Sequence, residues 1–392
     1  MHLRFTTAGE SHGPGLIAVI EGLPAGLELT PDDLNTDLAR RQLGHGRGGR
    51  MKIETDKATV LSGIRHGRTL GSPIALSIAN RDYANWEERM NPWPVDAEVA
   101  EVHLPRPGHA DLAGVQKFGH EDVRNVLERA SARETTSRVA VGAIARALLR
   151  EFGVEIRSHV TRIGAVDAPA RDEALGLEDF DGVDESPVRT LDKETERAMI
   201  QEINQQRKAN ESLGGIFEVI VFGLVPGIGS YTTWDGRIEG RLAQAMCSIQ
   251  AIKGVGFGDG FDVTGVPGSQ AHDEVFPGGE WGVNRRTNHA GGIEGGMTNG
   301  EPVVIKGAMK PLPTLTKPLR SVDIETGEPA EALRERTDSC TVPAAGVVAE
   351  AMAALVFADA YLEKFGGDNI ADTKAAIDAY RERLRQAVAT PR

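Results

Sequence analysis

The sequence predicts an α+β fold, with one domain over residues 1–392 in which two related units of sheet and helix share a core. The segment from Gly63 to Pro73 aligns at a constant offset with the segment from Gly292 to Pro302, and Gly, Ile, Gly, Thr, Gly and Pro coincide. Each segment follows a strand pattern, a turn containing proline and glycine, and a helical pattern. Two such units would bury their apolar faces together, which predicts a pseudo-twofold repeat. Convergent turn chemistry is the alternative, because glycine and proline recur in unrelated hairpins.

The elements of the first half follow from local patterns. An apolar run at 16–21 predicts a strand, closed by a turn at 22–26. Thr30 is placed to cap the next helix, Pro31 suits its first position, and Gly44 stops it. The remaining elements are expected as strands at 58–62 and 73–78 and as helical periodicity over 121–152 with a break near Ala130.

The second half alternates in the same way. Its elements are expected as helices at 194–207, 236–249 and 343–365, a polar final helix, and strands at 216–224 and 302–306. The helix at 343–365 is almost entirely apolar, which predicts a core position. Three stretches lack periodicity, at about 80–120, 262–292 and 308–340. Loops of this length are uncommon in compact domains unless they bind something, so we expect active-site loops there.

Composition excludes several classes of protein. The chain has 57 acidic and 44 basic residues, a net charge of -13, which argues against a general nucleic-acid binder. No window approaches about 18 uninterrupted apolar residues, and the first residues are not a signal sequence, which predicts a cytoplasmic protein with no membrane partner. Cys247 and Cys340 are too few for a disulfide framework or a cysteine-rich metal site.

Two glycine-flanked histidines are candidate proton donors. The segment from Gly9 to Gly15 places Ser11 and His12 in a turn before a strand, and His109 lies in a second turn at 106–111. Histidine changes charge near neutral pH and can hand a proton to a leaving oxygen. A structural histidine in a turn is the alternative reading. No histidine pair has metal-ligand spacing, so no catalytic metal is expected.

An arginine-rich segment at 40–52 favours a small anionic ligand. Guanidinium groups suit phosphate and carboxylate, and the interleaved glycines let the backbone approach closely. The spacing is not that of a P-loop. Solvated surface charge is the alternative, but a local basic cluster in an acidic protein favours anion binding. Its basic residues are Arg40, Arg41, Arg47, Arg50 and Lys52.

Four further segments each have more than one interpretation. Ser131 and Glu134 have capping-box spacing at a helix start, and Arg129 and Arg133 beside them would suit a phosphate there. Plain helix initiation explains the serine and glutamate equally well. The glycine run at 254–260 follows a helix rather than a strand, which argues against a dinucleotide loop. The other candidates are the rigid loop Lys310-Pro-Leu-Pro-Thr314 and the pair Arg336 and Asp338, of which Asp338 could simply cap a helix.

Several separated motifs make the chain resemble the chorismate synthase family over nearly its whole length. The signatures are Gly9-Glu-Ser-His-Gly13 through Glu21-Gly22, Glu128-Arg-Ala-Ser-Ala-Arg-Glu-Thr135, and Arg336-Thr-Asp-Ser-Cys340 with Val342-Pro-Ala-Ala345 and Glu350. The arginine segment, Arg106-Pro-Gly-His-Ala-Asp111 and Asn288-His-Ala-Gly-Gly292 match as well.

The resemblance implies a reaction and a cofactor. The reaction is 1,4-anti elimination of phosphate from 5-enolpyruvylshikimate 3-phosphate to give chorismate, the last common step of aromatic amino-acid biosynthesis. Reduced FMN is required although there is no net redox change. The family fold implies a β-α-β sandwich with two four-stranded antiparallel sheets, assembled as a homotetramer.

The resemblance also assigns residues. His12 would protonate the departing phosphate, His109 would keep a proton near the flavin, and Asp338, relayed by Ser11, would manage a flavin proton. Arg41 and Arg47 match positions for NADP or a substrate anion. The implied FMN contacts are Arg129, Ala130, Ser131, Gln250, Ala251, Gly295, Lys310, Pro311, Leu312, Pro313, Thr314 and Arg336.

Departures from the family pattern are small, and two other functions stay open. Ala130 and Thr337 stand where the family often has serine, which leaves backbone contacts but puts side-chain contacts there in doubt. A flavin-dependent oxidoreductase would use the same FMN contacts but turn over NADPH. A phospholigand- or RNA-binding module would use the segment 40–52, although interleaved aromatic residues are lacking there. We expect a monofunctional enzyme supplied with reduced FMN, with NADPH as a candidate electron source.

Overall fold

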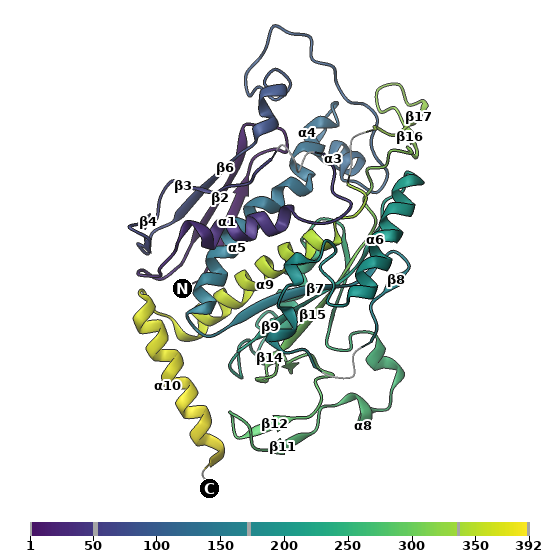
Figure 1. The fold of residues 1–392 in the computed structure, drawn as a ribbon. Helices are drawn as coiled ribbons and strands as arrows, with labels where there is room; N and C mark the ends of the chain where they lie inside the picture. Colours follow the sequence, from purple (N-terminus) through teal and green to yellow (C-terminus); the bar gives the residue numbers. More distant parts are fainter. Residues whose placement is uncertain (1, 50–53, 171–173, 335–337, 390–392) are drawn as a thin grey trace.

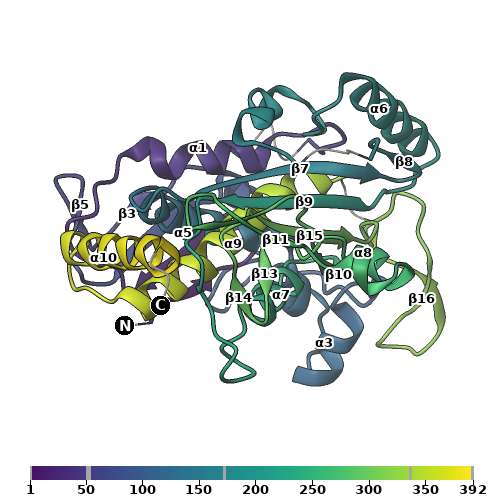
Figure 2. The same cartoon turned by 90° about the horizontal axis from the view of Figure 1, so that it is seen from below.

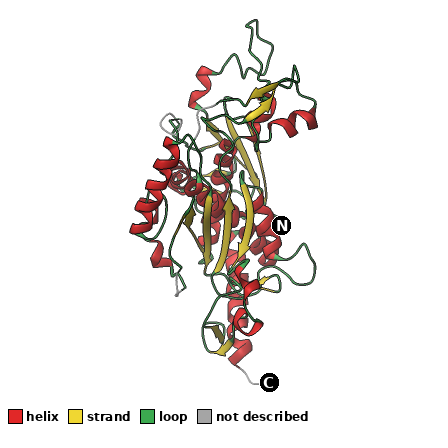
Figure 3. Ribbon diagram, turned by 90° about the vertical axis from the view of Figure 1, so that its right-hand side faces the viewer, coloured by secondary structure: helices red, strands yellow, loops and turns green. Residues whose placement is uncertain are grey.

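The computed structural model describes residues 2–49, 54–170, 174–334 and 338–389, and it confirms the α+β class. Its two larger sheets are antiparallel, with helices between them (Figure 1). The first sheet has the order β1-β2-β6-β3 and contains β1 (Arg4–Ala8), β2 (Gly15–Glu21), β3 (Thr59–Val60) and β6 (Ile74–Ala79). The second has the order β10-β15-β9-β7-β8 and contains β7 (Glu155–Ile163), β8 (Val166–Asp167), β9 (Gly215–Phe222), β10 (Ile252–Phe257) and β15 (Val303–Met309). Its long strands run side by side in Figure 3, and β8 is a fifth strand that the resemblance did not imply.

The helical layer is built on two long helices that cross closely. α5 (Thr135–Arg150) packs on β2, and α9 (Val342–Phe365) packs on β7 and β9. At their crossing a Cβ added to Gly142 would lie 2.4 Å from the Cβ of Ala351, so only glycine permits this approach. α9 is long and apolar enough to cross a membrane, but 89% of its most apolar window is buried inside the protein. The prediction of a core helix is therefore confirmed.

The other helices mostly follow the predicted patterns. Thr30 and Asp33 form the capping box at the start of α1, as their spacing predicts. The helix break expected near Ala130 is present. These helices are α1 (Pro31–Gln42), α4 (Arg124–Ala130), the 3-10 turn η2 (Ala132–Glu134), α6 (Lys193–Lys208), α7 (Ile238–Cys247) and α10 (Ile370–Ala389). Figure 2 shows α10 and α6 near opposite ends of the molecule.

The three stretches expected as long loops contain short elements, such as α3 (Asp111–Phe118) in the first of them. Outside these stretches, the first part of the glycine run at 254–260 belongs to β10. Four strands of the two larger sheets, β1, β7, β8 and β10, are missing from the sequence prediction. The short elements are η1 (Arg81–Asn85), η3 (Leu177–Phe180), η4 (Val183–Glu185), η5 (Asp262–Gly265), α8 (Gly268–Ala271), β11 (Val275–Pro277), β12 (Val283–Arg285), β16 (Arg320–Val322) and β17 (Pro329–Glu331).

The repeated sequence pattern adopts the same local structure in both halves. It forms the hairpins β4 (Ile64–Arg65) with β5 (Arg68–Thr69) and β13 (Ile293–Glu294) with β14 (Met297–Thr298). The same four positions of each hairpin have positive φ, namely Gly63, His66, Gly67 and Gly71 in one and Gly292, Gly295, Gly296 and Gly300 in the other. The strand order β1-β2-β6-β3 is also matched by β7-β9-β15-β10.

Two threonines anchor these hairpins through equivalent hydrogen bonds. Thr69 Oγ1 donates to the carbonyl of Pro24 at 2.7 Å and accepts from the backbone of Leu27 at 3.0 Å. Thr298 Oγ1 donates to the carbonyl of Val225 at 2.7 Å and accepts from the backbone of Ile228 at 2.9 Å. Each hydroxyl satisfies backbone groups that the turn after β2 or β9 would otherwise leave buried and unpaired.

Candidate active site

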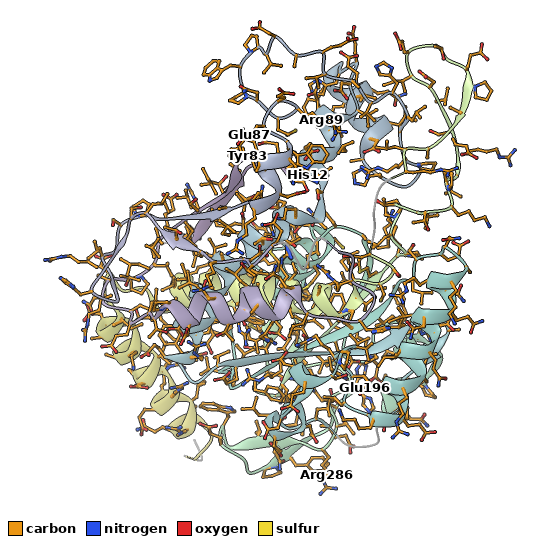
Figure 4. All side chains as sticks on the ribbon, turned by 45° about the horizontal axis from the view of Figure 1, so that its top comes forward. His12, Tyr83, Glu87, Arg89, Glu196 and Arg286 are labelled. Carbon is orange, nitrogen blue, oxygen red and sulfur yellow. The ribbon has the colours of Figure 1, made fainter. Side chains whose placement is uncertain are left out.

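The first predicted histidine lies in the turn between β1 and β2, against α4. His12 Nδ1 lies 2.9 and 3.0 Å from the two carboxylate oxygens of Glu128, and its ring stacks on Trp86 with centroids 4.0 Å apart. The backbone N–H of Ser11 donates to the carbonyl of Glu128 at 3.0 Å. Figure 4 shows His12 below the segment that carries Arg89. α4 therefore holds both the turn and the orientation of the imidazole.

The protonation state of Glu128 fixes that of the histidine nitrogen facing it. Burial by itself raises the pKa of Glu128, but hydrogen bonds from His12 and the charge of Arg124 outweigh it and hold the pKa below its ordinary value. Glu128 is therefore a carboxylate at neutral pH and only accepts hydrogen bonds. It follows that His12 Nδ1 carries a proton.

The second predicted histidine has the same arrangement. Asp111, the first residue of α3, is fully buried, and its carboxylate accepts from His109 Nδ1. Arg106 donates to the same carboxylate through Nε at 2.8 Å and Nη2 at 3.1 Å. Burial raises the pKa of Asp111, but the hydrogen bonds from His109 and Arg106 lower it well below its usual range. His109 Nδ1 is therefore also held as a donor by a charged carboxylate.

The predicted loop from Lys310 to Thr314 lies against this second histidine turn. Lys310 Nζ donates to the carbonyl of Gly108, and Arg106 Nη1 donates to Thr314 Oγ1 at 3.4 Å. Burial lowers the pKa of Lys310. The backbone N–H of Lys310 also donates to the carbonyl of Ala251 at 3.0 Å, which joins two of the predicted flavin segments. The other members of this loop are Pro311, Leu312 and Pro313.

A buried cluster of guanidinium groups contains both predicted anion-binding arginines. Arg41 Nη2 donates to Thr136 Oγ1, which also accepts from Arg133 Nη1 at 3.4 Å. Arg133 Nη1 donates to Asp56 at 2.6 Å. Burial, together with the charges of Arg133 and Arg47, lowers the pKa of Arg41 to about 9 despite the opposing charge of Asp56, so it stays charged at neutral pH.

Two nitrogens of this cluster are available to bind an anion. Arg41 Nε and Arg133 Nη2 are buried and have no hydrogen-bond partner among the residues that the structure describes. Buried donors of this kind cost free energy unless a ligand or water satisfies them. Arg133 Nε also donates at 3.0 Å to Asn80, whose amide donates to the carbonyl of Gly13 at 2.8 Å. Asn80 therefore connects the arginines to the His12 turn.

Asp338 lies at the other side of the arginine cluster. It accepts from the backbone of Gly48 at 2.5 Å, and Arg47 Nη1 is 3.4 Å from its carboxylate. The structure thus pairs Asp338 with Arg47, and the backbone N–H of Ser11 with Glu128. The relay between Ser11 and Asp338 that the resemblance implies stays a prediction. The predicted residues Arg50, Lys52, Arg336 and Thr337 lie outside the described residues.

Arg40 does not belong to this anion cluster. Its guanidinium donates to Glu350 at 2.7 and 2.9 Å and to Asp37 at 2.8 Å. Adjacent residues of a helix point in different directions, so Arg40 and Arg41 reach different partners from the same turn of α1. Arg40 is part of the internal framework of the helical layer.

The predicted flavin residues divide into two groups. Arg129 and Gln250 line an open groove of about 470 Å³ together with Thr7, Glu134, Arg138 and others. Arg129 donates to the carbonyls of Gly9 at 3.2 Å and Thr7 at 2.9 Å. Gly295 lies instead beside the N-terminus of α7, and the ten residues of that helix, about 15 Å, separate it from Gln250. Gly295 is not among the residues that line the groove, and its contact with the flavin stays a prediction.

The sequence predicts a capping box of Ser131 and Glu134, and this prediction is wrong for Glu134. Ser131 Oγ accepts from the backbone of Arg133 at 3.2 Å and so caps the 3-10 turn η2, just after Ala130. Glu134 instead accepts from Thr7 Oγ1 at 2.7 Å and from Arg138 and Gln250. Arg138 lies four residues further along the chain, the local spacing of a helical ion pair, whereas Thr7 in β1 and Gln250 after α7 reach Glu134 only through the fold.

Four site residues could not be assigned from local patterns. Asp111 and Glu128 lie inside the quoted motifs, but only the fold shows that each faces a histidine. Asn80 and Trp86 lie in the stretch without periodicity. Trp86 has one signal, its spacing of four from Asp82, whose carboxylate accepts from its indole at 3.2 Å.

Replacing Gly114 by alanine is expected to disturb the spacing of the two histidine turns. A Cβ at Gly114 of α3 would lie 2.3 Å from Cγ1 of Val126 in α4, so the helices must separate. Because α3 begins at Asp111 and α4 carries Glu128, we expect kcat to fall about tenfold or more, the scale of a small misplacement of reacting groups. Steady-state assays of phosphate release test this. Gly240→Ala in α7, where the added Cβ meets open space, is the matched control, and an unaltered kcat for Gly114→Ala would contradict the prediction.

Carboxylate-held histidines beside arginine donors suit an enzyme that removes phosphate from a small anion. Comparisons with known proteins agree. The family model described as chorismate synthase matches residues 3–362. A chorismate synthase of Rubrobacter xylanophilus is 54% identical over 98% of both chains, and that of Thermobifida fusca is 51% identical over 97% of this chain and 99% of its own. A crystal structure of chorismate synthase has a TM-score of 0.80 and 41% identity, covering 98% of this chain and 99% of that one. The chain belongs to the chorismate synthase family.

Family membership gives the activity. The protein is a lyase that eliminates phosphate from 5-enolpyruvylshikimate 3-phosphate to form chorismate, in the shikimate pathway of aromatic amino-acid biosynthesis. It acts on a small-molecule substrate, and its family uses reduced FMN. The sequence-based identification and its reaction are therefore confirmed.

Proposed function

We propose that the elimination takes place where the His12 turn, the arginine cluster and the 310–314 loop converge. The single observation that carries this site is the pair of buried guanidinium donors, Arg41 Nε and Arg133 Nη2, that make no hydrogen bond within the described part of the chain, although Arg133 Nη2 lies 3.6 Å from the carboxylate of Glu54. A phosphate group offers acceptors for such donors, and preorganised guanidinium groups stabilise charge that develops on it as the bond breaks. Arg47, paired with Asp338, adds a third guanidinium.

The groove lined by Arg129 and Gln250 is the place proposed for the cofactor. Gln250 Oε1 is buried without a hydrogen-bond partner in the described part of the chain, and it can accept from a ring N–H of a bound flavin. Ala251 has φ of 68°, a conformation that orients its backbone toward Lys310. Reduced FMN, when bound, supplies transient electron density that helps the phosphate to leave. Arg129, Ser131, Gln250 and the 310–314 loop would hold it.

The two histidines take separate proton roles in this proposal. His12 would protonate the leaving phosphate through Nε2, because Nδ1 faces Glu128. His109, held by Asp111, would keep a proton beside the 310–314 loop. Asp338 would accept a proton on the far side of the arginines. Removal of water from this polar site would strengthen each of these interactions.

We also propose an assembly, a location and an electron source. Exposed side chains of Tyr231, Trp234 and Phe261 support assembly as a homotetramer, which would cover them. One main hydrophobic core reaches both sheets, which supports a single domain over residues 1–392. A cytoplasmic location is proposed from the sequence alone. Arg41 is too deeply buried to suit a dinucleotide, so a substrate anion is its proposed ligand, and NADPH would supply electrons through a separate flavin reductase.

Anaerobic turnover of 5-enolpyruvylshikimate 3-phosphate tests the proposed site. Phosphate release and chorismate absorbance are expected with chemically reduced FMN, and neither with oxidised FMN nor without flavin. His12→Ala should lower kcat strongly while the affinity for reduced FMN, measured by titration, stays near that of the unaltered protein. Equal loss of both would contradict the role of His12 as a proton donor. Turnover of oxidised FMN with NADPH alone would contradict an external electron source.

A further inference from the structure

The two histidines that we propose to transfer protons have the same arrangement of partners. Each Nδ1 meets a buried carboxylate, Glu128 for His12 and Asp111 for His109, and the side chains of these two carboxylates are 3% and 0% exposed. Each carboxylate also takes a guanidinium from its own segment: Arg124 Nη1 lies 3.0 Å from Glu128, and Arg106 binds Asp111 through two nitrogens. Two independent segments thus converge on one histidine–carboxylate–arginine arrangement.

We infer that Glu128 and Asp111 are positioning residues of the reaction, which hold each imidazole with Nδ1 protonated and so make Nε2 the nitrogen that exchanges protons. This inference rests on the proposed roles of His12 and His109. When His12 Nε2 gives its proton to the phosphate oxygen, the imidazole becomes neutral and keeps the Nδ1 proton donated to Glu128. Before transfer, the negative charge of Glu128 stabilises the imidazolium.

Several aromatic and charged groups surround His12 and Glu128. On α4, Arg124 lies 3.0 Å from the carboxylate of Glu128, and its guanidinium lies 5.0 Å from the centre of the Trp86 ring. From η1 and its continuation, Trp86 covers one face of the imidazole, Arg89 lies 5.5 Å from the Trp86 ring, and Asp82 accepts from the Trp86 indole. Glu128 is thus the charged group whose hydrogen bonds to the imidazole the structure shows.

Two side chains, those of Arg106 and Asp111, lie within hydrogen-bond distance of His109 Nδ1. Arg106 Nη2 lies 3.2 Å from it and would donate to a bare nitrogen, but the Asp111 carboxylate is closer. A carboxylate oxygen and an unprotonated nitrogen would repel at such a separation, so the proton is on Nδ1. The hydrogen bonds from Arg106 to Asp111 fix the carboxylate in turn. Lys310, bound to the Gly108 carbonyl, is the other cation at this turn.

Glu128→Gln tests the inference, because glutamine can still accept from Nδ1 but lacks the charge. We expect kcat to fall about 10- to 100-fold, the usual cost of losing an outer partner of a functional histidine, with KM changed less than about twofold. The fall of kcat on the basic side of the pH profile should move to lower pH, because the imidazolium loses its stabilising charge. Asp111→Asn should likewise lower kcat more than it raises KM.

A matched control separates this role from a structural one. His159 Nε2 meets Glu218 at 3.0 Å, and Lys306 lies 3.7 Å from the same carboxylate, but this group is in the second sheet. Glu218→Gln is expected to leave kcat and its pH profile unchanged. Glu128→Gln with the kcat and pH profile of the unaltered protein would overturn the inference.

A double-mutant cycle covers the remaining outcomes. If Glu128 acts through His12, adding Glu128→Gln to His12→Ala should lower kcat no further. A full additional loss in the double variant would overturn the positioning role, whether or not Glu128→Gln weakens the fold. No effect of His12→Ala itself would instead refute the proposed site, which distinguishes the two failures.

Discussion

Replacing Glu350 by alanine is expected to lower the free energy of unfolding at neutral pH by about 3–5 kcal/mol, a large share of the total. Glu350 is fully buried on α9 and accepts from Arg40 at 2.7 and 2.9 Å, Arg146 at 2.9 Å, Arg189 at 3.1 Å and Ser158 at 2.6 Å. Its removal leaves three guanidinium groups buried without that charge. Loss of one partner of a buried ion pair costs about 3–5 kcal/mol, against a total stability of roughly 5–15 kcal/mol. Urea unfolding followed by circular dichroism measures this loss.

An exposed ion pair supplies the control for Glu350. Glu28 and Arg68 are paired at the surface, where such pairs contribute at most about 1 kcal/mol to stability. The urea midpoint of Glu28→Ala should therefore lie near that of the unaltered protein. A Glu350→Ala variant with an unchanged unfolding midpoint would show that the arginines find other partners.

The same carboxylate should make stability depend on pH. Burial alone would raise the pKa of Glu350, but the charges of Arg40, Arg146 and Arg189 hold it well below the ordinary value of 4.5. A lowered folded-state pKa gives stability that is complete above the unfolded-state pKa and is lost as pH falls toward the folded-state pKa. The unfolding midpoints of Glu350→Gln and the unaltered protein should therefore converge below about pH 4.5.

Replacing Arg47 by alanine is expected to lower kcat about 100- to 1,000-fold, or about 3 kcal/mol of transition-state stabilisation. Arg47 and Arg133 both act on the charge of Arg41, and Arg47 also pairs with Asp338, so all belong to one electrostatic unit. Arg47 is the cleaner test, because Arg41 is more deeply buried and its loss would also weaken the fold. Steady-state phosphate release with reduced FMN gives the measurement.

A surface arginine provides the comparison for Arg47. Arg68→Ala removes the same charge from an exposed hairpin and should keep kcat within about twofold. If Arg41→Ala and Arg47→Ala both turn over normally, these arginines do not belong to the active site.

Local sequence patterns predicted the elements whose conformation is determined by interactions within the same short segment. The capping box of Thr30 and Asp33, the glycines of the two hairpins and the apolar length of α9 each have a physical cause within a few residues. β1 was missed because its exposure alternates only between exposed and half-buried, and pairing with β2 makes it a strand. β7 is likewise defined by its partner β9.

The residues of the active site likewise fall into those that local patterns predicted and those that only the fold revealed. The sequence picked out His12, His109, Arg41 and Arg47 because their residue types and glycine-rich settings are specific. It grouped Arg40 with Arg41 and assigned Glu134 to a cap, and both assignments failed when the fold supplied nearer partners. Side-chain direction on a helix and contacts between distant segments are not local properties.

By itself the sequence determined the family, the reaction, the α+β class and the histidines and arginines proposed to act, because these depend on residue identity and short-range spacing. Only the tertiary structure decided which carboxylate faces each histidine, which arginines remain available to an anion, and how Glu350 joins the helices. Those pairings connect segments up to 310 residues apart. They form because burial of the two sheets against α5 and α9 removes water from charges that must then find partners inside the protein.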